Sequence, residues 1–182
     1  KRRGVYITLR EVLSEVGKDA LRFMMVSRSP DKVIDFDFDL IKSKSRENQV
    51  FYVQYAYARC CSVERIGEEI FNFKIKKNFG DVNLNLLELE EELNLIKNLA
   101  SYEKILNLAA KNFEPHRLTN FLYSIAKLFH NYWSLGTVDS NKRVINTKNS
   151  EISKARLILV LAVKLIIEKG LKILDISTPN TM

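Results

Sequence analysis

Apolar residues recur at spacings of three and four through most of the chain after residue 48, with polar residues between them. This period is typical of an amphipathic helix that buries one face. Pro115 suits a first helical turn, and Gly136 and Gly170 are expected to end helices. The pattern predicts helices over 48–71, 84–96, 101–113, 116–134 and 151–169, and polar loops over 73–83 and 136–150.

The first part of the chain carries helix-end signals in place of long stripes. Thr8 and Glu11 are spaced as a capping box, in which the hydroxyl accepts from the Glu11 amide while the carboxylate reaches back. A helix over 9–16 is therefore expected, and Gly17 can end it as a left-handed cap. Asp19 is then placed to cap the helix that follows.

Strict alternation of apolar and acidic residues over 32–40 favours an extended segment. The three aspartates lack the glycine and the final glutamate of a calcium loop, so no metal site is predicted. We expect them to fix this segment to the preceding helices, and the candidate pairs are Asp35 or Asp39 with Arg22 or Arg28. The fold class predicted is all-α, with a helical bundle over 48–182 preceded by a small helical connector over 1–47.

Charge and length narrow the classes of partner. The chain has 182 residues, enough for one substantial core, and a net charge of +7, which favours an anionic partner such as nucleic acid. Basic residues gather in the last quarter, whereas Glu88 to Glu92 form an acidic stretch expected on an outer helix face. The two cysteines are adjacent, which excludes a disulfide framework or a CxxC metal pair, so reduced cytosolic thiols are expected. The apolar run 157–163 is too short to span a bilayer. The candidate phosphate contacts are Arg143, Lys148, Lys154 and Arg156.

The stretch 48–65 combines tyrosines with an amide and a guanidinium. An accessible tyrosine beside Arg59 can stack on an unpaired base and hold a phosphate, as proteins that bind RNA loops do. Core packing is the alternative for aromatic residues at helical spacing. His130, in a second aromatic run, could be a catalytic base, but the sequence offers it no evident nucleophile, so a hydrogen-bonded structural histidine is expected.

Several blocks of the chain resemble arginyl-tRNA synthetases, a class I family, in the family's order. Residues 52–59 read YVQYAYAR and are similar to the family's YVQYAHAR motif, with Tyr57 in place of the histidine. Residues 19–22 read DALR, the string after which the family's anticodon-binding domain is named, and 34–40 resemble its DFDLD stretch. The ending GLKILDISTPNTM, over 170–182, is similar to the family's GLxLLGVSAPERM.

The resemblance implies recognition of the anticodon of tRNA(Arg), with its middle cytosine as the main determinant. Gln54 would read a base edge, and Met182 would lie at the anticodon loop. The implied anticodon contacts are Tyr52, Gln54, Tyr55, Arg59, Trp133 and Met182. The parent enzyme, cytoplasmic and monomeric, would attach arginine to tRNA using ATP with magnesium. This chain is expected to lack the catalytic domain, with Lys1 as a remnant of the KMSKS-like loop, and to need no cofactor of its own.

Two other functions are compatible with a basic helical bundle. A protein-interaction or scaffold domain would use the acidic stretch and the amphipathic helices. An RNA-binding regulator unrelated to aminoacylation is a further alternative. Neither accounts for the ordered match of four blocks, so anticodon recognition is the leading hypothesis.

Overall fold

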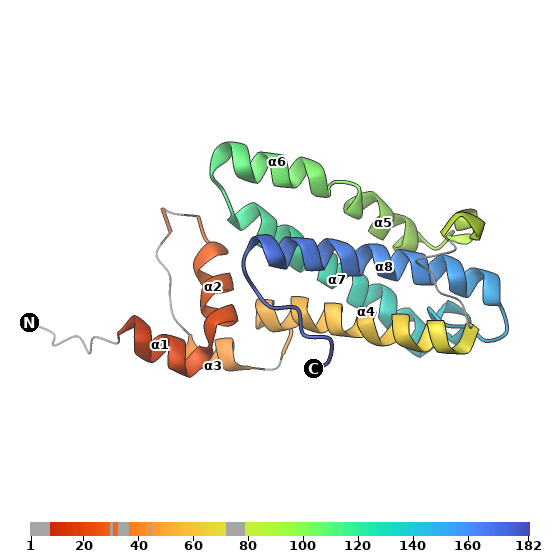
Figure 1. The fold of residues 1–182 in the computed structure, drawn as a ribbon, viewed down its shortest axis with the longest axis horizontal. Helices are drawn as coiled ribbons and strands as arrows, with labels where there is room; N and C mark the ends of the chain where they lie inside the picture. Colours follow the sequence, from red (N-terminus) through yellow and green to blue (C-terminus); the bar gives the residue numbers. More distant parts are fainter. Residues whose placement is uncertain (1–7, 30, 33–36, 44, 72–78) are drawn as a thin grey trace, which may run out of the picture.

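The computed structural model describes residues 8–29, 31–32, 37–43, 45–71 and 79–182, and within these ranges it contains helices and no strand. The all-α prediction is confirmed. A bundle of five helices adjoins a connector of three short ones (Figure 1). The bundle consists of α4 (Gln49–Phe71), α5 (Glu90–Leu99), α6 (Tyr102–Asn112), α7 (His116–Val138) and α8 (Ser150–Ile173), and the connector of α1 (Leu9–Val16), α2 (Lys18–Val26) and α3 (Phe38–Lys42).

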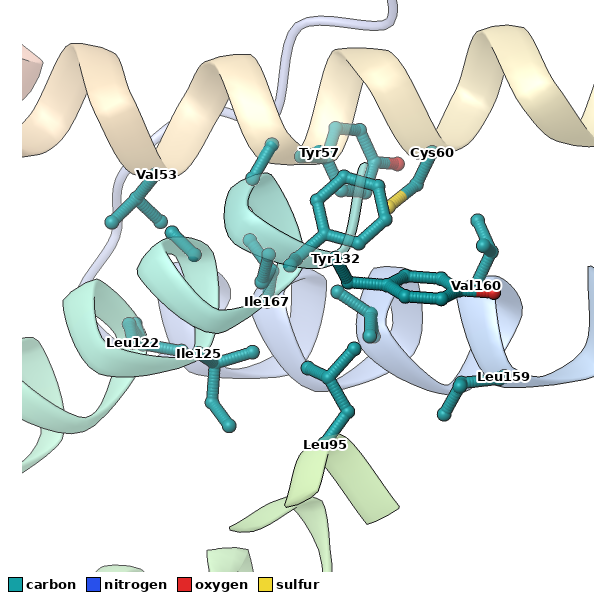
Figure 2. Close-up of a cluster of buried hydrophobic side chains, with 14 of the residues drawn as sticks. Val53, Tyr57, Cys60, Leu95, Leu122, Ile125, Tyr132, Leu159, Val160 and Ile167 are labelled. Atoms are coloured by element: carbon teal, nitrogen blue, oxygen red, sulfur yellow. The ribbon is translucent and has the colours of Figure 1, made fainter. Parts of the chain in front are cut away.

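Three long helices surround the centre of the core. α4 and α7 run in the same direction and α8 runs against them, while α5 and α6 lie along the other side of the bundle (Figure 1). Their apolar stripes meet at fully buried side chains such as Val53, Leu122 and Ile167, and Leu95 of α5 packs into the same cluster (Figure 2). None of the helices in the described ranges combines the length and apolarity needed to cross a bilayer.

A buried ion pair joins α5 to α8. The Glu92 carboxylate is completely buried and accepts hydrogen bonds from Arg156 Nε at 2.7 Å and from the Tyr132 hydroxyl at 3.0 Å. Burial raises the pKa of Tyr132, so its hydroxyl stays protonated and donates. The expectation that Glu92 lies on an outer face is therefore wrong. The helix begins at Glu90, later than the leucine spacing predicted, and its first turn directs Glu92 inward.

Two glycines expected to end helices lie inside them. α7 continues past Gly136 and α8 past Gly170. A side chain at Gly136 would come within 2.9 Å of the Arg143 Cα, and one at Gly170 within 2.6 Å of a Leu122 methyl. Both glycines therefore allow close packing. The segment after α7 was predicted as a polar loop over 136–150 and was expected not to pack. This expectation is wrong, because Val144 is buried.

The connector begins with the expected capping box: Thr8 accepts from the Glu11 amide, and the Glu11 carboxylate accepts in return. Gly17 separates α1 from α2 with φ +82°, a conformation that favours glycine. Asp19 does not cap α2. It lies in the first turn, and its carboxylate bonds elsewhere. Of the segment expected to be extended, residues 33–36 lie outside the described ranges, and α3 begins at Phe38 with Asp37 as its cap.

Candidate nucleic-acid interface

One side of α4 and one side of α7 bring aromatic rings around an arginine. Tyr52, Tyr55 and Arg59 are spaced by three and four residues on α4, so they share a face. His130 and Trp133 lie three apart on α7 and meet that face. All these side chains except His130 are partly exposed. We call these five residues the Arg59 cluster.

The Arg59 guanidinium is held at the centre of the cluster. Its Cζ lies 4.4 Å from the centre of the Tyr55 ring and 5.0 Å from that of Trp133. One terminal nitrogen donates to the Tyr55 hydroxyl at 2.8 Å, and the other lies 3.0 Å from His130 Nδ1. A guanidinium stacks well on aromatic rings because its charge is delocalised and weakly hydrated. The positive charge is thus fixed among rings at the protein surface.

The contacts of His130 define its tautomer. Arginine can only donate, so Nδ1 accepts from Arg59, and Nε2 donates to the Tyr52 carbonyl oxygen at 3.2 Å. Burial lowers the pKa of His130 to about 4, the Tyr52 hydrogen bond partly opposes this, and the charge of Arg59 lowers it further. The imidazole is therefore neutral at neutral pH. The prediction of a hydrogen-bonded structural histidine is confirmed.

The tyrosines of α4 differ in their surroundings. Tyr55 stacks on Phe51, with ring centres 5.9 Å apart and an angle of 11° between the planes. Tyr52 lies between His130 and Tyr123, with ring centres 4.4 and 5.5 Å away, and burial raises the pKa of its phenol. Tyr55 and Trp133, which flank the guanidinium, are thus the rings most directly associated with positive charge.

Two of the residues expected to contact RNA are buried and form hydrogen bonds within the protein. Gln54 is only 7% exposed, and its amide donates to Asp19 Oδ2 and to the Ser177 carbonyl, both at 3.0 Å. Arg156 is 5% exposed, with its guanidinium bound to Glu92 and to two carbonyl oxygens. Neither side chain is presented to a ligand, so the base contact expected of Gln54 and the phosphate contact expected of Arg156 are both wrong.

The other expected residues remain at the surface. Arg143 lines a pocket of about 370 Å³ together with Trp133, which places it next to the Arg59 cluster. Lys148 is exposed, whereas Lys154 is paired with Glu151 at 2.8 Å. Met182 is 53% exposed at the end of a tail that crosses α4 (Figure 1). Lys1 lies outside the described residues.

Sequence reasoning missed Tyr123 and the part that His130 plays in holding Arg59. The signal was available, because positions 123, 130 and 133 are spaced by seven and three and therefore share one face of a helix. What the spacing does not indicate is which face of α4 this face meets. No group of three histidine, cysteine, aspartate or glutamate side chains able to hold a metal ion occurs among the residues described.

The fold and the cluster fit a domain that binds an RNA loop, and comparison with known proteins gives the family. Residues 53–182 match the family model of the DALR anticodon-binding domain, and the chain belongs to this family. Its relatives include proteins named arginine-tRNA ligase. That of Caldanaerobacter subterraneus subsp. tengcongensis is 45% identical over 182 residues, and that of Rickettsia peacockii 42% over 187 residues.

The alignments cover all of this chain but only 31% and 32% of those two proteins, so the chain spans about a third of their length. Among solved structures, the arginyl-tRNA synthetase of Thermus thermophilus superposes with a TM-score of 0.74 at 25% identity, covering 100% of this chain and 29% of that one. A Campylobacter jejuni protein assigned to the arginyl-tRNA synthetases superposes with a TM-score of 0.79 at 24% sequence identity, covering 100% of this chain and 37% of that one. This likeness shows a shared fold.

Proposed function

We propose that this chain binds the anticodon arm of an arginine tRNA, as the anticodon-reading part of an arginine-tRNA ligase. The observation that carries the proposal is the Arg59 guanidinium fixed between the rings of Tyr55 and Trp133 on a partly exposed surface of the bundle. Unpaired bases stack on such rings, and a neighbouring phosphate finds the positive charge beside them. Membership of an anticodon-binding family supports the same function.

Affinity and selectivity would come from different groups. A stacked base contributes about 1–3 kcal/mol and accepts any base with a flat face. Exposed Arg143 and Lys148 would neutralise phosphates and make binding depend on salt. Preference for the middle anticodon cytosine then requires polar groups at the cluster, where the guanidinium of Arg59 and the hydroxyl of Tyr55 are available.

The names of the relatives support a wider proposal for the parent protein. It would ligate arginine to its tRNA in the cytoplasm using ATP with magnesium, and the residues described here would place the anticodon. Nothing in this proposal requires a cofactor bound to the bundle itself.

The experiment measures binding of this chain to a fluorescent anticodon stem-loop of an arginine tRNA, at two salt concentrations. A stem-loop with the middle cytosine replaced by uracil is the comparison. We expect tighter binding to the cytosine form. Tyr55→Leu should weaken that binding by about tenfold, since it keeps an apolar side chain but removes the stacking ring. Tyr102→Leu, which changes a partly buried tyrosine on α6, is the matched control and should bind as the unchanged protein does.

Lys148→Ala separates phosphate attraction from base recognition. It should lower the salt dependence by about 0.7–0.9 in the slope of log affinity against log salt, without changing the preference for cytosine. Equal binding to both stem-loops would reduce the function to attraction of phosphates. Absence of binding at low salt would contradict the proposal.

A further inference from the structure

The segment after α8, residues 175–182, is called the tail here, and it is held at a junction of three side chains. Gln54 donates to Asp19 Oδ2 and to the Ser177 carbonyl oxygen, both at 3.0 Å. The Ser177 amide donates to Asp19 Oδ1 at 3.2 Å, and its hydroxyl donates to Asp19 Oδ2. Residues from α2, α4 and the tail thus share one carboxylate, and Gln54 is buried at their meeting point.

A second set of contacts fixes the start of the tail to α2. Asp175 adopts the left-handed conformation, with φ +54°, and the Ile176 amide donates back to the Leu171 carbonyl at 2.9 Å, which closes α8 in a Schellman motif. Arg22 Nε donates to the Leu174 carbonyl at 2.6 Å. The Asp175 carboxylate pairs with Lys18 at 3.0 Å and with Arg22 at 3.5 Å.

Both charged ends of the DALR string therefore contact the end of the chain. Asp19 and Arg22 are three residues apart on α2 and face the same way, while Leu21 is buried toward the bundle. The string joins the connector to the segment that follows α8, across more than 150 residues of sequence.

Beyond the junction the tail follows α4. Ser177 lies at Gln54, and the Cys61 thiol lies 3.6 Å from Asn180 Oδ1. From position 54 to 61 a helix advances about 10 Å, at 1.5 Å per residue. An extended chain covers about the same distance in three residues, at roughly 3.3 Å each. The tail is thus extended along α4 between positions 54 and 61, on the side of the helix that carries Gln54 and Cys61.

We propose that Asp19 and Gln54 are positioning residues that hold the tail on α4, so that the position of α2 sets where the exposed end of the tail lies on the helix that also carries Arg59. Its consequence for RNA rests on the proposed function, whereas the attachment of the tail does not. The junction connects the connector, which adjoins one end of the bundle (Figure 1), to α4, the helix that also carries Tyr55 and Arg59.

The two cysteines provide a reporter for this attachment. Cys61 is partly exposed beneath Asn180, whereas Cys60 is completely buried and its burial raises the pKa of its thiol. The rate of modification by a maleimide, with a Cys61→Ser variant to measure the background from Cys60, therefore reports how often the tail leaves α4. This measurement needs no RNA.

The variants to compare are Asp19→Asn and Ser177→Ala, with Asp39→Asn as the matched control for charge, since Asp39 is an exposed carboxylate of the same connector. Loss of even one hydrogen bond of the junction should raise the modification rate of Cys61 about fivefold. Ser177→Thr keeps a hydroxyl and should restore protection. Ser177→Ala lies outside the core, so it should lower the unfolding temperature by only about 2–4 °C.

Stem-loop binding completes the test. Asp19→Asn and Ser177→Ala should weaken binding by about fivefold or more, while Asp39→Asn should not. An unchanged modification rate in both junction variants would overturn the proposed attachment. Faster modification with unchanged RNA affinity would overturn the positioning role. If the unchanged protein binds no stem-loop, the proposed function fails, and the modification rates still decide whether the junction of Asp19, Gln54 and Ser177 holds the tail.

Discussion

Replacing His130 by glutamine should make the bundle less sensitive to mild acid. The buried imidazole has a pKa of about 4 in the folded protein, against 6.5 ordinarily. Between these values the unfolded chain takes up a proton that the folded chain does not, so the free energy of unfolding falls as the pH falls. Each pKa unit corresponds to about 1.36 kcal/mol, which gives about 3 kcal/mol in total and about 2 kcal/mol between pH 6.5 and 5.

Glutamine is suited to this test because it offers an acceptor for Arg59 and a donor for the Tyr52 carbonyl, as the neutral imidazole does. Urea unfolding at pH 7 and pH 5 measures the free energy of unfolding of both proteins. The unchanged protein should lose about 2 kcal/mol more than His130→Gln over this range. His116→Gln is the control and should retain the pH dependence attributed to His130. Equal losses, or an imidazole of His130 that titrates near 6.5 by NMR, would refute the reasoning.

Two further substitutions test the packing of the bundle by urea unfolding. Glu92→Leu should lower the free energy of unfolding by about 3–5 kcal/mol, because it leaves a buried guanidinium without its carboxylate. The control is Glu90→Gln, at an exposed position of the same helix, which should change the free energy of unfolding by less than about 0.5 kcal/mol. Similar values for both variants would contradict the role of the ion pair. Gly136→Ala should cost about 1–3 kcal/mol, since the added methyl meets the backbone at Arg143, whereas Gly80→Ala has open space and serves as its control. No loss for Gly136→Ala would mean that the segment after α7 shifts freely.

The helices were predictable where apolar residues repeat with a helical period. The long helix α4 begins and ends within a residue of its predicted bounds, and the capping box at Thr8 is present. The errors lie where a local signal competes with packing. Glycines that usually end helices continue them at Gly136 and Gly170, because close contacts there leave no room for a side chain.

The sequence places side chains on a helix face but does not indicate which of them are exposed. Tyr55, Arg59 and Trp133, which the resemblance implies as anticodon contacts, lie together at the surface, and their contact with RNA stays a prediction. Gln54 and Arg156 were assigned to RNA, but both are used inside the protein, one at the tail and one by Glu92. Spacing within a helix places a side chain on a face, whereas its partner comes from a segment far away in the sequence.

The contacts of Arg59 lower the entropic cost that binding of an RNA loop would carry. A long arginine side chain in solution samples many rotamers, and fixing it costs up to about 2 kcal/mol of conformational entropy. Here Tyr55, His130 and Trp133 already fix it, so that cost belongs to folding and not to binding. The surface is thus preorganised, and a loop would dock against a guanidinium whose orientation is set before the two molecules meet.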